Sequence, residues 1–328
     1  MRAVRLYGVG DLRVEDVEDP GAPAGDQVRL RVEMAGICGS DLHNYRTGIW
    51  ISRAPSTPGH EFVATVEAVG PAVAALAPGD RVVADSRVPC GTCPSCRAGK
   101  GYLCAGMGFV GEVNDGGFAP VTVLPERQVL RLPDQTVPAA VAAMAEPLAV
   151  ALHAINRLAA PAGAPVLVMG AGPIGALSAL VLGHRGHPVV LAEPNAARRA
   201  LVSEVAGAAP GGPAPGHLAH AIDTTGAPAA LAQALETVAR GGRLAVVGLY
   251  HGSVPVDLNR VVEGGLEVAG CAAFDGELEE AVALLAPLAD RLAALGGAPV
   301  ALEAVPAAYG ALIAGGSAVV KQLVDPAG

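Results

Sequence analysis

The first part of the chain contains short runs in which apolar and polar residues alternate. In residues 27–35, apolar residues at every second position alternate with arginine and glutamate. A period of two predicts a strand with one face buried. Similar runs, some of them entered through Gly/Pro turns, lie at 3–6, 12–17, 58–70 and 78–83. Many short strands joined in this way favour a β-rich, barrel-like domain up to about residue 135.

From about residue 137 the apolar runs are longer and alternate between helical and strand-like patterns. Residues 137–158 predict a helix, 165–169 a buried parallel strand, the residues up to about 183 a helix and 188–192 the next strand. Further strands are predicted at 220–223, 243–247, 266–269 and 318–324, and helices at 228–239, 278–285 and 305–313.

Two stretches of this second part need a separate interpretation. Residues 158–183 carry no charge and are long enough to cross a bilayer. Prolines and glycines break the stretch into a strand, a turn and a helix, so we expect no membrane span. Residues 206–216 (AGAAPGGPAPG) have low complexity and predict a surface loop.

A glycine motif joins the strand at 165–169 to the following helix. Its residues are Gly170, Gly172, Pro173, Ile174 and Gly175. In this context glycines let a pyrophosphate approach the helix N-terminus, and an acid at the end of the next strand binds the adenosine ribose. Glu193 is that acid, so the motif predicts a dinucleotide site.

The residues near Glu193 bear on the choice of cofactor. Its carboxylate would repel a 2′-phosphate, which favours NAD over NADP. Arg198 and Arg199 leave NADP open as the alternative. We add Val247 and Leu249, at the end of the strand predicted at 243–247, to the expected cofactor contacts.

Composition narrows the class of protein. The chain has 328 residues, 52% hydrophobic and 16% charged, which suits two globular domains. A net charge of −9 disfavours nucleic acid as a partner, because phosphate binding needs a basic surface.

The first residues lack the apolar segment of a secretion signal. We therefore expect a cytoplasmic protein whose clustered cysteines bind metal instead of forming disulfides.

Four of the six cysteines lie in one glycine-rich loop. Cys90, Cys93, Cys96 and Cys104 are separated by two, two and seven residues, a spacing that suits one tetrahedral zinc. An iron–sulfur cluster is the alternative, although the plant-type and bacterial spacings differ. Four thiolates leave no open position, so this zinc is expected to stabilise the fold.

A second set of reactive side chains is spread over three motifs. They are Cys38, Ser40, Asp41 and His43 in the stretch 36–43, His60 and Glu61 in Gly-His-Glu, and Glu146 in an otherwise apolar helix. Thiolate, imidazole and carboxylate are zinc ligands. A buried glutamate is costly unless it is paired or bound to metal. Each motif alone also fits an ordinary turn or core residue.

Together, the motifs resemble a known family. Cys38-Gly-Ser-Asp-Leu-His43, Gly59-His60-Glu61, the loop 90–104, Glu146-Pro147-Leu148 and the motif 170–175 occur in this order. The set resembles the zinc-dependent alcohol dehydrogenases of the medium-chain dehydrogenase/reductase family, over essentially the whole chain. It looks most like the branch that contains the sorbitol, threonine and L-idonate dehydrogenases.

The resemblance implies an α/β fold with two domains. We expect a GroES-like catalytic domain at 1–147 with the structural zinc loop 90–104, a Rossmann domain at 148–284 with a doubly wound parallel sheet, and a return to the catalytic domain at 285–328. It also implies two zinc ions per chain, NAD, a small-molecule alcohol as substrate, and a homo-oligomer, either a dimer or a tetramer. The family gives no reason to expect a membrane partner.

The resemblance assigns the catalytic zinc to one group of residues. Cys38 and His60 would bind it, with Glu61 or Glu146 as the third protein ligand, and a position would stay open for substrate. Asp41 would orient His60 by accepting its second N–H.

The same resemblance implies a proton relay. Ser40 would take the proton of the alcohol and pass it through the cofactor ribose to His43 and solvent. Hydride would move between NAD and a secondary alcohol, such as a polyol, cyclitol, sugar derivative or diol.

The chain departs from the family pattern at two positions. Ala64 stands where the family usually has glycine, and Ala273 stands where the sorbitol and idonate enzymes usually have arginine. The loss of the guanidinium predicts weaker recognition of a free polyol or sugar acid. Tyr45, Trp50 and Phe109 are candidates to line the pocket instead.

Two other function classes are the alternatives. A zinc-free quinone or enone reductase of the same superfamily would not need the zinc ligands. A non-catalytic nucleotide-binding or zinc-stabilised protein would be expected to have lost some of them. The complete ligand set favours the dehydrogenase.

Overall fold

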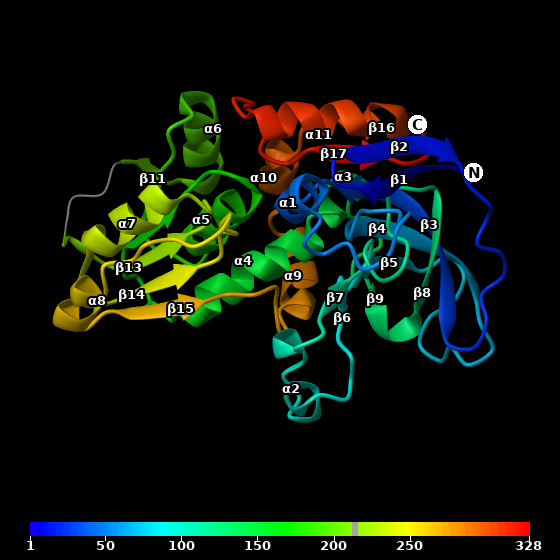
Figure 1. Cartoon of the computed structure of the whole chain (residues 1–328), viewed down its shortest axis with the longest axis horizontal. Helices are drawn as coiled ribbons and strands as arrows, with labels where there is room; N and C mark the ends of the chain where they lie inside the picture. The colour runs from blue at the N-terminus through cyan, green and yellow to red at the C-terminus, as the bar shows by residue number, and fades with distance from the viewer. Residues whose placement is uncertain (212–215) are drawn as a thin grey trace. The chain divides into compact units, whose positions relative to one another are not determined.

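The computed structural model describes residues 1–211 and 216–328, and its contacts divide the chain into two compact units (Figure 1). Unit 1 comprises Met1–Glu146, Leu278–Ser317 and Lys321–Gly328, and unit 2 comprises Pro147–Glu277 and Ala318–Val320. The predicted boundary at 284 falls inside α9 (Leu278–Leu285), and the contacts divide the chain before this helix. The physical reason is that α9 packs against α3 (Ala139–Ala142) of unit 1.

Unit 1 is built on a seven-stranded sheet with the order β16-β17-β3-β4-β5-β9, in which β8 also pairs with β3. Its strands are β3 (Gln27–Gly36), β4 (Glu61–Val69), β5 (Arg81–Ala84), β8 (Val121–Pro125), β9 (Val129–Arg131), β16 (Val300–Ala301) and β17 (Leu323–Asp325). In β3, Val28, Leu30 and Val32 are buried in the core, which explains the period of two in the sequence. The strand predicted at 318–324 is shorter than expected, because only 323–325 pair with β3 and β16.

Smaller elements surround this sheet. They are the hairpin β1 (Arg2–Gly8) and β2 (Asp11–Asp16), the ribbon β6 (Arg87–Val88) and β7 (Gly108–Phe109), the helices α1 (Gly39–Thr47), α2 (Pro94–Arg97), α10 (Ala289–Leu295) and α11 (Val305–Ala314), and the 3₁₀ turns η1 (Gly101–Leu103), η2 (Glu126–Gln128) and η3 (Leu302–Ala304). In the sequence, the cysteine loop 90–104 lies between β6 and β7. The C-terminal β17 lies beside β3, so the end of the chain completes the sheet begun near its start (Figure 1).

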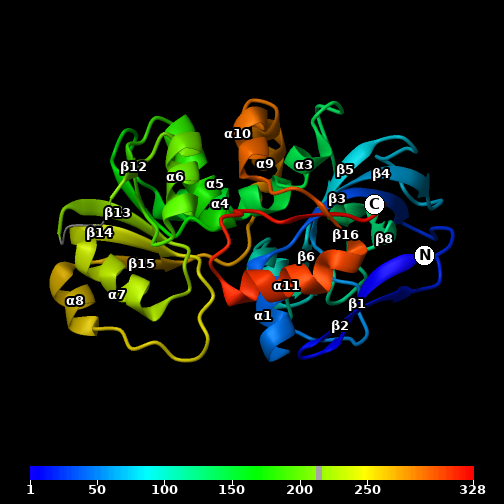
Figure 2. The same cartoon turned by 90° about the horizontal axis from the view of Figure 1, so that it is seen from above.

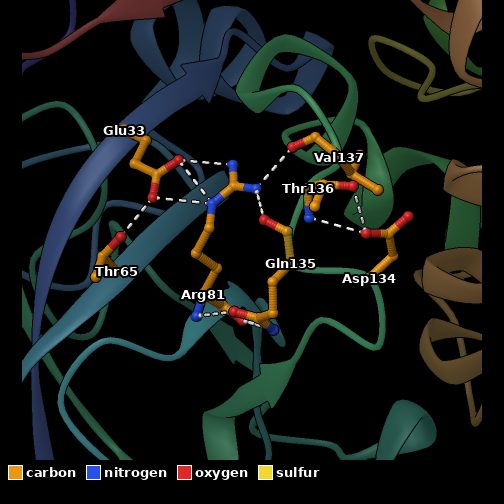
Figure 3. Close-up of polar contacts among 7 residues, drawn as sticks. All are labelled: Glu33, Thr65, Arg81, Asp134, Gln135, Thr136 and Val137. Carbon is orange, nitrogen blue, oxygen red and sulfur yellow. Dashed lines mark hydrogen bonds and ion pairs between the residues drawn. The ribbon is translucent and has the colours of Figure 1, made fainter.

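Arg81 ties the segment before α3 to this sheet (Figure 3). Its guanidinium donates to Glu33 at 2.7–3.2 Å and to the backbone carbonyls of Gln135 and Val137 at 2.6 and 2.7 Å. The Thr65 hydroxyl donates to the same Glu33 carboxylate. Because residues 135–137 lead into α3 and then to Glu146, this network helps to fix the start of the helix that carries the predicted ligand.

Unit 2 is built on a six-stranded parallel sheet with the order β12-β11-β10-β13-β14-β15. The strands are β10 (Val166–Met169), β11 (Val189–Ala192), β12 (Ala209–Pro210), β13 (Leu218–Asp223), β14 (Val238–Val246) and β15 (Glu267–Gly270). The helices α5 (Pro173–His184) and α6 (Ala196–Ala206) cover one face, and α7 (Pro228–Thr237) and α8 (Leu258–Gly264) cover the other (Figure 2). The strand order reverses between β10 and β13, which is where doubly wound sheets bind ligands.

Three predicted elements of this part have different bounds in the structure. The helix predicted at 137–158 is interrupted between α3 and α4 (Ala145–Leu158). The helix predicted at 228–239 ends at Thr237, because Val238 already pairs with Leu218 in the sheet. The loop predicted at 206–216 contains the short strand β12, and its residues 212–215 lie outside the described residues.

Among the residues that the structure describes, one helical stretch is long and apolar enough to cross a membrane. Residues 139–158, formed by α3 and α4, are sufficiently apolar, but 78% of the apolar window is buried inside the protein. Such burial is typical of a core helix in a globular protein. The uncharged stretch 158–183 is divided as predicted, into β10, the glycine turn and α5.

Candidate active site

The strand register of unit 1 brings Cys38 next to His60 and Glu61. β3 ends at Gly36 and β4 begins at Glu61, and these two residues face each other in the antiparallel ladder. Cys38 follows β3 and His60 precedes β4, so one ladder places both side chains together. The ligand atoms of Cys38, His60 and Glu61 all lie within 4.8 Å of one another. This donor set and spacing fit a zinc ion.

Helix α1 begins at this cluster. Cys38 is its N-cap, and the backbone N–H of Cys38 donates to Asp41 Oδ2 at 2.9 Å. Asp41 Oδ1 is 3.5 Å from His60 Nδ1, and the Ser40 hydroxyl is 3.5 Å from His60 Nε2. Asp41 therefore lies between the helix cap and the imidazole, where it can orient both.

The charges of the cluster act strongly on one another. Burial raises the pKa of Asp41, and the charge of His60 opposes this shift. Burial acts to lower the pKa of His60, but Asp41 and Cys38 hold it well above its ordinary value. The surrounding anions thus stabilise positive charge on the imidazole. A metal ion would supply positive charge at the same place and displace the proton.

Lys321 is a buried partner of Glu61 that the sequence analysis did not identify. Its ammonium donates to Glu61 Oε2 and, at 3.0 Å, to the carbonyl oxygen of Ile37. Gly36 provides the space, because a Cβ there would lie 2.5 Å from Lys321 Cε and 2.7 Å from Glu61 Oε2. Burial acts to lower the pKa of Lys321, but Glu61 keeps it above its usual value.

Glu146 lies in the first turn of α4 and is also buried. Its Oε1 accepts a hydrogen bond of 2.6 Å from the Ser86 hydroxyl. Burial raises the pKa of Glu146 to about 7, with His60 opposing and Glu61 adding to this shift. Among the described residues, the compact ligand group contains Glu61 and not Glu146. Both glutamates thus lie near the imidazole, and the identity of the third ligand stays a prediction.

Two further ionisable side chains act on this cluster and were missed from the sequence. The Tyr309 hydroxyl of α11 is buried without a hydrogen-bond partner in the described part of the chain. Burial, with Asp41 and Cys38, raises the pKa of Tyr309 well above its ordinary value. Glu112, half-buried after β7, has its pKa raised to about 7 by burial. Neither residue lies in a motif, so only the fold could reveal their position.

Of the other residues predicted for this site, some form ring contacts with histidine and one packs in the hydrophobic core. The ring of His43 is 4.7 Å from that of Trp50, and the ring of Phe109 is 6.2 Å from that of His60. Phe109 therefore lies beside a predicted metal ligand. Tyr45 packs against the hydrophobic core of unit 1, which supports a packing role.

The four clustered cysteines converge in space. The Sγ atoms of Cys90, Cys93, Cys96 and Cys104 lie within 4.8 Å of one another, with Cys90 to Cys96 at 4.0 Å and Cys93 to Cys96 at 3.5 Å. Four sulfurs at about 2.3 Å from one zinc would be roughly 3.8 Å apart. Hydrogen bonds from Thr92 lower the pKa of Cys90 to about 6, whereas burial raises that of Cys96 to about 12. The loop thus fits a tetrahedral zinc.

The glycine motif of unit 2 turns directly from β10 into α5. Gly170 has φ +94°, and a Cβ at Gly175 would lie 2.0 Å from the carbonyl oxygen of Gly170. Gly172 is the N-cap, followed by Pro173 and Ile174 as the first helical residues. The turn therefore requires glycine, and it lies at the reversal of strand order where a dinucleotide is expected.

Glu193 contacts this turn. Its Oε2 accepts the backbone N–H of Ala171 at 2.7 Å and its Oε1 that of Asn195 at 2.8 Å. The Arg199 guanidinium donates to the Glu193 backbone carbonyl, and the Arg198 amide donates to Asn195 Oδ1 at 3.1 Å. Each carboxylate oxygen of Glu193 can still accept a second hydrogen bond, such as one from a ribose hydroxyl.

The segment with Val247 and Leu249 lies beside the end of β13. The Val247 amide donates to the carbonyl of Asp223 at 2.9 Å. A Cβ at Gly226 would lie 2.2 Å from the carbonyl oxygen of Leu249. The segment therefore packs closely at the carboxyl edge of the sheet, and the Leu249 side chain is largely exposed there.

Comparisons with known proteins agree with this arrangement. The family described as "Alcohol dehydrogenase GroES-like domain" matches residues 24–134, and "Zinc-binding dehydrogenase" matches residues 213–287. The chain is 35% identical over 279 residues to an L-threonine 3-dehydrogenase of Anaeromyxobacter dehalogenans, which covers 78% of each protein. The chain belongs to the zinc-dependent, medium-chain alcohol dehydrogenase family.

Solved structures of this alcohol dehydrogenase family match the whole chain. A zinc-binding dehydrogenase of Sinorhizobium meliloti bound to NADP has a TM-score of 0.91 at 31% identity and covers 99% of both chains. Galactitol-1-phosphate dehydrogenase of Escherichia coli has a TM-score of 0.89 at 28% identity and covers 99% of this chain and 100% of that one. The predicted family, fold class and reaction class are confirmed. The protein is an oxidoreductase that uses zinc and a nicotinamide cofactor and acts on a hydroxyl group of a small molecule.

Proposed function

We propose that this alcohol dehydrogenase interconverts a small secondary alcohol and its ketone with NAD, at the site around Cys38 and His60. The observation that carries the proposal is the convergence of thiolate, imidazole and carboxylate within 4.8 Å beside the Ser40 hydroxyl. Zinc, when bound, supplies a Lewis acid that lowers the pKa of the substrate hydroxyl, and the nicotinamide accepts the hydride.

The protein side chains hold and orient this site. Cys38, His60 and either Glu61 or Glu146 bind the metal. Asp41 orients the imidazole of His60 through its Oδ1 atom. The Oδ2 atom of the same carboxylate accepts the Cys38 amide, which holds the carboxylate in place.

We assign proton transfer to Ser40 and His43. Ser40 lies 3.5 Å from His60 Nε2, so its hydroxyl is placed beside the metal-facing edge of the imidazole. His43 follows on the next turn of α1, on the same side of the helix, and is partly exposed. The Ser40 hydroxyl would accept the proton of the substrate hydroxyl and pass it through the cofactor ribose to His43, which would release it to solvent.

We further propose a second, structural zinc at Cys90, Cys93, Cys96 and Cys104, and NAD in preference to NADP. The sulfur separations support the first proposal. The position of Glu193 on the glycine turn supports the second, because a 2′-phosphate would be repelled there.

Metal analysis and an activity panel test the proposed function. The purified protein should contain two zinc ions per chain, and NADH should form from one or more members of a panel of secondary alcohols, diols, cyclitols, L-threonine and polyol phosphates. L-Threonine and a polyol phosphate belong in the panel because named relatives carry these substrates in their names. One zinc per chain in an active sample would contradict the catalytic metal.

We also propose that the protein is a cytoplasmic homo-oligomer, a dimer or a tetramer. β15 is an edge strand, and Val268 on it and Val262 on α8 are 49% and 77% exposed. An exposed apolar strand edge is readily covered by another chain. Light scattering should give a mass of two or four chains, and a monomer at micromolar concentration would contradict the proposal.

A further inference from the structure

Three segments at the carboxyl edge of the unit 2 sheet pack directly against one another. They are the glycine turn 170–175 after β10, residues 224–226 after β13 and residues 247–250 after β14. The Thr224 amide and hydroxyl donate to the Met169 carbonyl at 3.0 and 2.8 Å, which joins the first two segments. A Cβ at Gly248 would lie 2.1 Å from the Gly226 nitrogen, so the second and third segments lie in direct backbone contact. The reversal of strand order, where a dinucleotide is expected, lies at this edge.

Asp223, the last residue of β13, connects the second and third segments and is completely buried. Its Oδ1 accepts the amide and the hydroxyl of Thr225 at 2.9 and 2.7 Å, and its Oδ2 accepts the Tyr250 hydroxyl at 2.5 Å. Its backbone carbonyl accepts the amides of Val247 and Gly248 at 2.9 and 3.2 Å. One buried residue therefore holds both ends of the segment 247–250.

The Tyr250 phenol is the anchor at the far end of this segment. The backbone hydrogen bonds of the segment end at Gly248, and in the described part of the chain residues 249 and 250 make none. Leu249, between the two anchors, has a side chain that is 49% exposed. Burial and the hydrogen bond to Asp223 raise the pKa of Tyr250, so the phenol remains a donor at neutral pH.

We propose that Tyr250 is a positioning residue for the nicotinamide cofactor, because its hydrogen bond to Asp223 holds the backbone of residues 247–249 in the conformation that binds the cofactor. This inference rests on the proposed function and on the predicted cofactor contacts of Val247 and Leu249. A segment that is already ordered loses less conformational entropy when a ligand binds, so the anchor strengthens cofactor binding. Tyr250 acts through the backbone and takes no part in hydride or proton transfer.

Two matched tyrosine variants test this role. Tyr250→Phe keeps the ring and removes only the hydroxyl. Fluorescence titration of the zinc-loaded protein should show that it raises the dissociation constant of NADH roughly three- to tenfold, the range expected for one net hydrogen bond. Tyr7→Phe is the control, because the Tyr7 phenol also donates to a carboxylate, Glu15 at 2.8 Å, but lies on β1 of unit 1. It should leave the NADH affinity unchanged.

Hydrogen exchange provides a readout that does not depend on turnover. In the cofactor-free protein, the amides of Val247 and Gly248 should exchange faster in Tyr250→Phe than in the wild type. NADH should slow the exchange of residues 247–250 in the wild type. In steady-state kinetics, Tyr250→Phe should raise KM for NAD and leave kcat at saturating NAD nearly unchanged, as expected for a residue that only positions the cofactor site.

The outcomes separate the inference from the proposed function. An unchanged NADH dissociation constant in folded Tyr250→Phe would overturn the inference and leave the proposed function intact. A lack of NADH protection at residues 247–250 in the wild type would do the same, and this measurement needs no variant. A wild type that neither binds NADH nor forms it from any alcohol of the panel would contradict the proposed function instead.

Discussion

The Lys321 ammonium donates to the carboxylate of Glu61, 260 residues away in the sequence, and both side chains are almost completely buried. The pair connects the segment before the C-terminal strand to the first residue of β4, directly beside His60. A buried carboxylate without a partner is strongly unfavourable. The C-terminal segment therefore contributes a compensating charge to the predicted metal site as well as a strand to the sheet.

Lys321→Met should destabilise the protein by about 3–5 kcal/mol, because it leaves Glu61 buried and unpaired. Urea unfolding of the zinc-free protein measures this loss. Lys100→Met, which changes the other lysine of the chain at an exposed position, should have little effect. Adding Glu61→Gln to Lys321→Met should recover part of the loss, and strictly additive effects would show that the pair is not coupled.

The two predicted zinc sites should respond differently to the loss of one thiolate. Cys38→Ser should reduce zinc to one ion per chain and abolish NADH formation, while the unfolding midpoint changes little. Cys93→Ser should also remove one zinc, but it should lower the midpoint, because a zinc held by four thiolates is expected to stabilise the fold of the loop. Zinc analysis and thermal unfolding of both variants provide the comparison. Full activity of Cys38→Ser would exclude its role.

Glu193→Ala should change the cofactor preference. The substitution removes the acceptor on the Ala171 amide and the negative charge that repels a 2′-phosphate. Loss of a charged hydrogen-bond partner should lower kcat/KM for NAD by roughly tenfold or more, with a smaller loss for NADP. Glu204→Ala, which changes an exposed acid on the adjacent helix α6, is the control. An unchanged NAD/NADP ratio would place Glu193 outside the cofactor site.

Asp19 should contribute to stability in a defined pH range. The Arg29 guanidinium, which donates to both carboxylate oxygens at 2.6 and 2.8 Å, and the Gly21 amide lower the pKa of Asp19 from 3.8 to about 2. A lowered pKa in the folded state means that the stabilisation is complete above pH 3.8 and disappears as the pH falls towards 2.

Urea unfolding of Asp19→Asn tests this range. The difference in stability from the wild type should be constant between pH 7 and 5 and should shrink as the pH falls from about 4 to 2. Glu18→Gln at the neighbouring position should show no such trend. A difference that grows on acidification would contradict the assigned direction of the shift.

The sequence was most informative where a function lies within one continuous segment. The cysteine loop 90–104 was predicted from its spacing, and the glycine turn 170–175 from its spacing together with the strand before it and the helix after it. In both, the short chain between the residues limits how far they can separate. The alternation in 27–35 likewise predicted β3 and its buried face. By contrast, the boundary at 284 stays a prediction, and the contacts divide the chain before α9 instead, since the packing of α9 against α3 leaves no periodic pattern in the sequence.

The sequence by itself thus determined the family, the fold class and the types of ligand that the protein carries. Only the tertiary structure decided which distant side chains share the site. The register between Gly36 and Glu61 brings Cys38 to His60, the C-terminal segment adds Lys321, α11 adds Tyr309, and the segment after β7 adds Glu112. These contacts depend on the closure of long loops, and the sequence contains no local spacing that specifies them.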